Sequence, residues 1–332
     1  MNPSHAGRLP RRGLLAAGLA IPALVPRPGR AQAAWPDRPV RMVVPYAAGG
    51  PTDAVARLVA ERLSSDLPQR VVVENRGGGG ALPGTEAVAR APRDGSTLLF
   101  TTVVHAVHRA LHGGRLTFDP AADFAPVALV GVVPMVILVP PDSPYRDLPS
   151  LLAALRRDAQ PYGSSGVGGS SHLGVELLKS MTGIRTEHIP YRGTGPAVVD
   201  LLAGRVALVM DSVATGAAQV KAGALRGLAT TGPRRSSALP ELPTVAETVP
   251  GFEATTWNAV LSPAGTDPAV LDAQNAAIGR VLADGAVQEK LAALGVEIPP
   301  PDQRSREAAA AFVAAETRKW EGLIREAGIR AE

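Results

Sequence analysis

The chain has 332 residues, of which 45% are hydrophobic, and this length favours two lobes of ordinary size. It contains no cysteine, which excludes a disulfide framework, a thiolate metal site and a thiol nucleophile. The formal net charge is +4, but five arginines lie in the first 33 residues, and without them 29 basic residues face 30 acidic ones. A nucleic-acid partner or an anionic membrane surface therefore has no support from composition.

The N-terminal segment 1–33 has the organisation of a signal peptide. Its arginines flank an apolar stretch, 13–25, that is too short to span a membrane, and it ends in Ala-Gln-Ala, a pattern that signal peptidase accepts. The pair Arg11 and Arg12 is typical of a twin-arginine export signal. We therefore expect cleavage after Ala33, with the twin-arginine route favoured over general secretion. No later stretch reaches the roughly 18 consecutive apolar residues of a membrane-spanning helix, so the mature protein is expected to be soluble.

Beyond the signal segment, short apolar runs alternate with segments in which apolar residues recur at helical spacing. This alternation predicts an α/β fold with parallel, doubly wound sheets and ligands at the carboxyl ends of the strands. The expected strands are 40–44, 70–73, 97–102, 127–139, one beginning at 161, 186–189, 206–210, 225–230 and 256–261. The expected helices are 54–67, 85–91, 148–157, 172–181, 196–203, 215–222, 268–283, 287–294 and 304–327.

Two apolar stretches, 127–139 and 256–261, are each expected to cross between lobes. One lobe would then comprise 34–133 and 258–332, and the other would comprise 134–257. Two lobes joined by two crossings form a hinge with a cleft between the lobes.

Two glycine-containing loops follow the first two strands and precede helices. The loop 45–53 contains a glycine pair, with Thr52 or Asp53 as a possible helix cap, and the loop 75–84 contains four consecutive glycines. Such loops leave the first N–H groups of a helix free to bind an anion, although either loop alone could be an ordinary turn. The second loop matches neither a dinucleotide fingerprint nor a P-loop. A nucleotide is therefore disfavoured, and a small carboxylate remains open.

Three histidines, His105, His108 and His112, could share one face of a helix. Zinc binding is conceivable, but no Cys or zincin glutamate completes the ligand set. We therefore interpret these histidines as residues of a surface helix and expect no metal site.

The loop 162–172 combines several hydroxyl groups with His172 just before a helix. A serine hydrolase is the alternative here, but the Gly-x-Ser-x-Gly elbow is absent, and ligand binding is favoured over hydrolysis. Arg192 could pair with a ligand carboxylate or be solvated. Asp211, at the end of a strand, could accept a hydrogen bond from a ligand or cap the next turn.

Together these loops resemble the Bug-type substrate-binding proteins of tripartite tricarboxylate transporters, over essentially the whole chain after the signal segment. The resemblance implies a type II periplasmic binding protein fold and a monomeric periplasmic receptor without cofactor or enzymatic activity. Such a receptor presents a small organic carboxylate to membrane permease subunits. The motifs that carry the resemblance are Trp35-Pro36-Asp37-Arg38-Pro39-Val40, Val44-Pro45-Tyr46-Ala47-Ala48-Gly49-Gly50-Pro51-Thr52-Asp53, Val73-Glu74-Asn75-Arg76, Asp94-Gly95-Ser96-Thr97-Leu98-Leu99, Tyr162-Gly163-Ser164-Ser165-Gly166, His172-Leu173, Pro190-Tyr191-Arg192-Gly193 and the segment 200–206.

The resemblance also implies a site in which the two glycine loops hold one carboxylate through backbone N–H groups and waters, while the second lobe supplies side chains. Members of the family usually have Gly-Ala-x-Gly where this chain has Gly-Gly-Gly-Ala at 78–81, so a positive φ at Ala81 would be strained. A sensor that feeds a signalling partner and, less favoured, a serine/histidine hydrolase remain alternatives. The implied ligand-binding residues are Tyr46, Ala47, Gly49, Gly50, Thr52, Asp53, Gly78, Gly79, Gly80, Ala81, Thr102, Ser164, Ser165, Ser170, His172 and Asp211.

Overall fold

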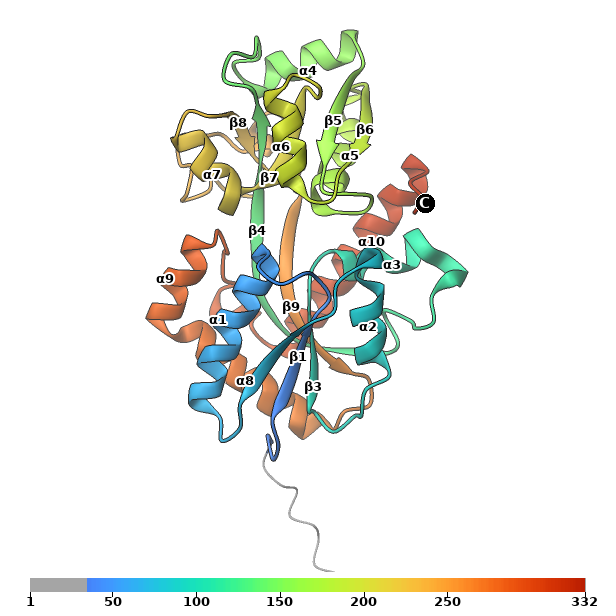
Figure 1. The fold of residues 1–332 in the computed structure, drawn as a ribbon, viewed down its shortest axis with the longest axis vertical. Coiled ribbons are helices and arrows are strands. Elements are labelled where there is room, and N and C mark those ends of the chain that lie inside the picture. Colours follow the sequence, from blue (N-terminus) through green and yellow to red (C-terminus); the bar gives the residue numbers. More distant parts are fainter. Residues whose placement is uncertain (1–34, 332) are drawn as a thin grey trace, which may run out of the picture. The chain divides into compact units, whose positions relative to one another are not determined.

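The computed structural model describes residues 35–331, so the signal-peptide prediction for 1–33 lies outside the described residues. Two sets of parallel strands form the core of the fold (Figure 1). In the first set, β1 (Val40–Val44) pairs with β2 (Val71–Asn75) and β3 (Thr97–Thr101). In the second set, β5 (Gln160–Ser164) pairs with β6 (Thr186–Pro190) and β7 (Leu208–Ser212).

Antiparallel strands join the two sets. β4 (Phe124–Val139) pairs with β9 (Thr255–Pro263) over its first part, and with β7 and β8 (Arg226–Thr230) over its last part. β9 also pairs with β3, which gives the strand order β2-β1-β3-β9-β4-β7-β5-β6. Figure 1 shows β4 running the length of both sheets. The parallel prediction is therefore confirmed for β1 to β3 and for β5 to β7, whereas β4, β8 and β9 pair in antiparallel fashion. The lobe boundaries stay a prediction.

Alternate residues of the strands are buried in different cores, as the two-residue period of a strand requires. In β1, Met42 packs with α1, α8 and α9, whereas Val43 packs with α2, α3 and α10 on the other face. Helices therefore cover both faces of the first sheet, as predicted for a doubly wound fold. The helices are α1 (Pro51–Asp66), α2 (Leu82–Ala89), α3 (Val104–His112), α4 (Leu148–Arg157), α5 (Ser170–Thr182), α6 (Thr194–Leu202), α7 (Val213–Lys221), α8 (Pro268–Ala283), α9 (Gly285–Ala293) and α10 (Arg306–Ala327).

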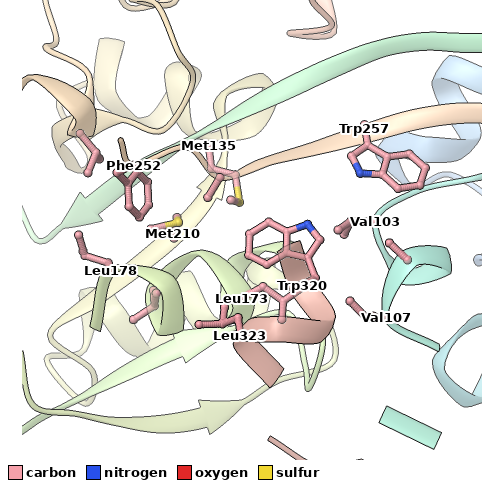
Figure 2. Close-up of a cluster of buried hydrophobic side chains, with 14 of the residues drawn as sticks. Val103, Val107, Met135, Leu173, Leu178, Met210, Phe252, Trp257, Trp320 and Leu323 are labelled. Atoms are coloured by element: carbon pink, nitrogen blue, oxygen red, sulfur yellow. The ribbon is translucent and has the colours of Figure 1, made fainter. Parts of the chain in front are cut away.

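The C-terminal helix α10 contacts α3, which follows the first set of strands, α5, which belongs to the second set, and the joining strand β4. Figure 2 shows Trp320 of α10 between Leu173 of α5 and Trp257 of β9. The buried carboxylate of Glu316 accepts hydrogen bonds from Nε1 of Trp257 at 3.1 Å and of Trp320 at 2.7 Å. This pairing fixes α10 against the face of β9 to which Trp257 belongs.

Several helices begin two or three residues before the predicted start, closer to the preceding loop. α1 begins at Pro51 after an N-cap at Gly50, and α5 begins at Ser170 after an N-cap at Gly169. The predictions started at the first periodic apolar residue and so missed a first turn made of Pro, Gly and hydroxyl residues. As a result, Thr52 and Ser170 lie within first helical turns rather than in loops. Between residues 35 and 331, no helix has both the length and the apolar character needed to cross a bilayer.

Candidate functional site

A cleft of about 710 Å³ lies at the carboxyl ends of β1, β3, β5 and β7. Residues that directly follow these strands line the cleft, and both glycine loops contribute to it. Both glycine loops therefore border the same cleft, as predicted. The predicted site residues that line the cleft are Tyr46, Ala47, Gly50, Thr52, Gly78, Gly79, Gly80, Ala81, Thr102, Ser165, Ser170 and Asp211.

Asp53 does not line the cleft but holds the first glycine loop from behind. Its buried carboxylate accepts hydrogen bonds of 2.9 Å from the backbone N–H of Gly49, from Asn75 Nδ2 and from Arg57 Nε. Asn75 opens the second loop and also donates to the Tyr46 carbonyl at 3.2 Å. Asp53 therefore ties the two loops together. Gly49 likewise does not line the cleft.

The environment of Asp53 keeps its carboxylate ionised. Burial raises the pKa of Asp53, but the hydrogen bonds from Arg57, Gly49 and Asn75 together outweigh burial, so the pKa lies below its ordinary value of 3.8. The N-cap of α1 is Gly50, without a side-chain cap, so the prediction that Thr52 or Asp53 caps this helix is wrong. Asp53 binds the N–H that precedes the helix, which gives the loop a fixed shape.

The second loop turns through four successive residues with positive φ: Gly78 at 109°, Gly79 at 48°, Gly80 at 66° and Ala81 at 69°. Ala81 is the one non-glycine residue with positive φ in the described part of the chain. The strain that the sequence predicted at this position is therefore present, and it costs about 1–2 kcal/mol. The loop passes through a 3-10 turn, η1 (Gly79–Ala81), into α2. As at any helix start, the first N–H groups have no partner within the helix.

His108 supports the second loop from α3. Its Nε2 donates to the Gly80 carbonyl at 3.0 Å, and its ring is fully buried against Phe118. His105, one turn earlier, donates from Nε2 to the Pro120 carbonyl at 2.9 Å and is also buried. Desolvation lowers the pKa of His108 to about 4 and that of His105 to about 3, so both rings are neutral at pH 7.

The interpretation of these histidines as surface residues is wrong for His105 and His108. α3 packs between the first sheet and α10, so one face of the helix is inaccessible to water. Sequence reasoning missed His108 as a support of the site, although the apolar residues interleaved with the histidines were a usable signal of burial. No group of three metal-ligating side chains occurs in the part of the chain that the structure describes.

On the opposite side of the cleft, Ser165 and Ser170 line the cleft, whereas Ser164 and His172 lie behind the loop. His172 Nδ1 accepts from the backbone N–H of Gly168 at 3.0 Å, and its ring stacks on His188 with 3.8 Å between centroids. Ser164 Oγ lies 2.6 Å from His188 Nε2. Burial lowers the pKa of His172 to about 3, and the neighbouring His188 and Lys179 contribute to the same shift. The buried contacts of Ser164 and His172 hold the loop 162–172 in its shape.

Ser165, which faces the cleft, is bonded to another serine. Its backbone N–H donates to Ser171 Oγ at 2.8 Å, and the two hydroxyl oxygens are 2.9 Å apart. Ser165 is therefore paired with another hydroxyl and not with an imidazole. The serine that contacts an imidazole, Ser164, is fully buried. This geometry does not fit a nucleophile and general base that meet at the cleft.

Two charged side chains, Arg192 and Asp211, line the cleft. Asp211 accepts from the Ser212 N–H at 2.8 Å and from Thr215 Oγ1 at 2.7 Å, whereas the N-cap of α7 is Ser212, which accepts from the Ala214 N–H. Arg192 is exposed and has no ion pair among residues 35–331, unlike Arg205, which pairs with Asp200. Arg192 is therefore the positively charged side chain that borders the cleft.

The crossing strands supply a set of cleft residues that sequence reasoning did not identify. β4 contributes Val133 and Met135, and β9 contributes Thr256 and Asn258. These residues lie in the middle of strands, where the local sequence indicates burial but not the cavity they border.

Two α/β halves joined by crossing strands, with loops at the strand carboxyl ends around one cleft, define a type II periplasmic binding protein fold. Residues 55–329 match the family model described as the tripartite tricarboxylate transporter family receptor, and the chain belongs to this family. Both the fold and the family predicted from the sequence motifs are therefore confirmed.

Solved structures agree with this assignment. The periplasmic binding protein BugD is 36% identical, with a TM-score of 0.77 over 90% of this chain and 100% of that chain. Rpa4515 of R. palustris with adipate is 34% identical, with a TM-score of 0.79 over 90% of this chain and 100% of that chain. MatC of Rhodopseudomonas palustris with bound malate is 31% identical, with a TM-score of 0.76 over 87% of this chain and 100% of that chain. BugD is a periplasmic binding protein, and the other two structures contain the carboxylates adipate and malate.

Proposed function

We propose that this protein is an exported periplasmic receptor that captures a small organic carboxylate in the cleft and presents it to a tripartite tricarboxylate-type permease. The observation that carries the proposal is the convergence of both glycine loops on one cleft at the starts of α1 and α2. Helix N-termini place N–H groups and the positive end of the helix dipole at the same point, which favours an anion.

The charges around the cleft support the same ligand class. The oxygens of Asp211 are bonded within their own turn, and the carboxylate of Asp53 is buried behind the first loop. Arg192 adds a positive charge on the opposite side. A ligand with one carboxylate on the glycine loops and a second near Arg192 would be bound at both ends. Adipate and malate, which the related receptors hold, are both dicarboxylates.

The proposal includes no chemical step. The hydrolase alternative needs a serine and a histidine at the cleft, and the serine nearest to an imidazole is buried. The proposed receptor uses Ser165 and Ser170 as hydrogen-bonding groups and uses His172 to shape their loop.

The proposal is tested by a thermal-shift screen of the mature protein against dicarboxylates, tricarboxylates, aromatic acids and amino acids, followed by calorimetry of the acids that bind. A binding acid raises the melting temperature, and we expect one site per chain. The methyl ester of the best acid should not bind, because it lacks the charge that the loops recognise. Equal binding of acid and ester would contradict the proposal. Uptake lost on deletion of the receptor, and restored by the chain, would separate transport from sensing.

A further inference from the structure

Asn258 presents an unsatisfied polar group at the cleft. Its side chain is 4% exposed, and its Oδ1 has no hydrogen-bond partner among the described residues. It shares one face of β9 with Thr256, two residues away, and both residues line the cleft. Trp257, between them, points to the other face and bonds to Glu316. The amide of Asn258 is therefore a buried polar group at the cleft rather than part of the α10 contact.

The surroundings of Asn258 place it close to the first glycine loop. β9 pairs with β3 at Ala259 and Thr101, and the same register sets Asn258 beside Thr102 at the end of β3. Thr102 Oγ1 is 2.5 Å from the hydroxyl of Tyr46, which belongs to the first loop. The hydroxyls of Thr102 and Tyr46 are thus engaged with each other, and the neighbouring strand β4 contributes apolar Val133 and Met135 to the cleft.

We propose that Asn258 is a specificity-determining residue that hydrogen-bonds a hydroxyl or ammonium group on the ligand, close to the carboxylate held by the glycine loops. This inference rests on the proposed function and names the subclass of ligand: hydroxy or amino acids rather than plain acids. A buried amide without a partner is costly, so a ligand that supplies the missing donor regains that cost. A site built to bond a hydroxyl rejects the analogue that lacks it more strongly than an apolar pocket distinguishes two alkyl groups.

The test compares matched sets of acids by calorimetry: succinate, malate and aspartate, and 3-phenylpropionate, 3-phenyllactate and phenylalanine. Wild-type protein should bind a hydroxy or amino member of at least one set roughly 10-fold or more tightly than the plain acid. Asn258→Leu should abolish this preference while the plain acid binds as well as before or better. Thr255→Val, on the same strand but outside the lining of the cleft, is the control and should keep the preference.

A second measurement distinguishes recognition from a structural role. Asn258→Leu should melt no lower than wild type without ligand, because it removes a buried amide that has no partner. Asn258→Ala serves the same comparison if the leucine variant does not fold. Equal affinities for plain and substituted acids in wild type, or a preference that survives in both variants, would overturn the inference while leaving the proposed function intact. Binding of no carboxylate at all would contradict both.

Discussion

The two sides of the cleft use different chemistry. The glycine loops after β1 and β2 present main-chain N–H groups, and Asp53 and His108 hold them from behind. The loops after β5 and β6 present side chains, including Ser165 and Arg192, and His172 supports the former loop from behind. Main-chain donors recognise a negative charge and are insensitive to what carries it, whereas side chains discriminate between ligand bodies. The comparison predicts that the glycine loops supply affinity shared by all acids. Side chains, those after β5 and β6 and Asn258 of β9, are then expected to select among the acids.

The largest expected effect comes from Asp53→Ala, which removes the carboxylate that joins the two glycine loops. The variant loses three hydrogen bonds to a buried charge, and we expect a loss of about 3 kcal/mol in the free energy of unfolding. Affinity should fall at least 10-fold for every acid, because both loops lose their shape. Denaturant unfolding and calorimetry measure the two effects.

The matched control is Asp147→Ala, which removes the exposed N-cap of α4 away from the cleft. It should destabilise the protein less and leave affinity unchanged. Unchanged affinity in Asp53→Ala would contradict the role assigned to that carboxylate.

The buried imidazoles predict a loss of stability in acid. The pKa of His105 and His172 is lowered to about 3, and that of His108 to about 4, from an ordinary value of 6.5. Between these values the unfolded chain binds protons that the folded chain does not, so the free energy of unfolding falls as the pH decreases from about 6.5 towards 4. Urea unfolding at pH 7.5, 6 and 5 checks this. The His105→Phe variant should show a weaker dependence on pH, and an equal dependence would contradict the burial argument.

His108→Phe tests the supporting role of α3 on the affinity side. The Gly80 carbonyl loses its donor, which should destabilise the protein by about 1–3 kcal/mol and lower affinity several-fold for all acids alike. His105→Phe leaves the Pro120 carbonyl without its donor but does not touch the loop, so it should lose stability without losing affinity. Calorimetry and melting temperatures of both variants separate these outcomes. A similar loss of affinity in both would indicate a general packing effect.

The smallest expected effect is a gain. Ala81→Gly relieves the positive φ of 69° and should raise the free energy of unfolding by about 0.5–1 kcal/mol, after the entropic cost of glycine is subtracted. Ala309→Gly, within α10, provides the opposite control and should be destabilising. Thermal unfolding of the two variants measures both changes in stability. A lower melting temperature for Ala81→Gly would show that the alanine methyl contributes more in packing than it costs in strain.

The sequence was sufficient for elements whose ends carry local signals. α4 and α8 were predicted with the observed bounds, and each begins with an Asp N-cap and a proline in the first turn. The helices α1 and α5 were predicted to begin too late, because Gly50 and Gly169 act as N-caps without the usual side-chain signal.

The glycine loops were recognisable because their residue types are unusual and their function depends on the local backbone. Asn258 and Val133 were not predicted to line the cleft, because their position depends on the antiparallel pairing of β4 with β9, more than a hundred residues apart in the sequence. His108 was misread for a similar reason, since its ring is buried against Phe118 and the second glycine loop, which the periodicity of α3 alone does not reveal.

A crystal structure of the mature protein with the tightest-binding acid from the screen would test the central claim most directly. We predict one carboxylate within hydrogen-bond distance of backbone N–H groups from both glycine loops, at the starts of α1 and η1. A carboxylate bound to Arg192 with no ligand atom at the glycine loops would contradict the account.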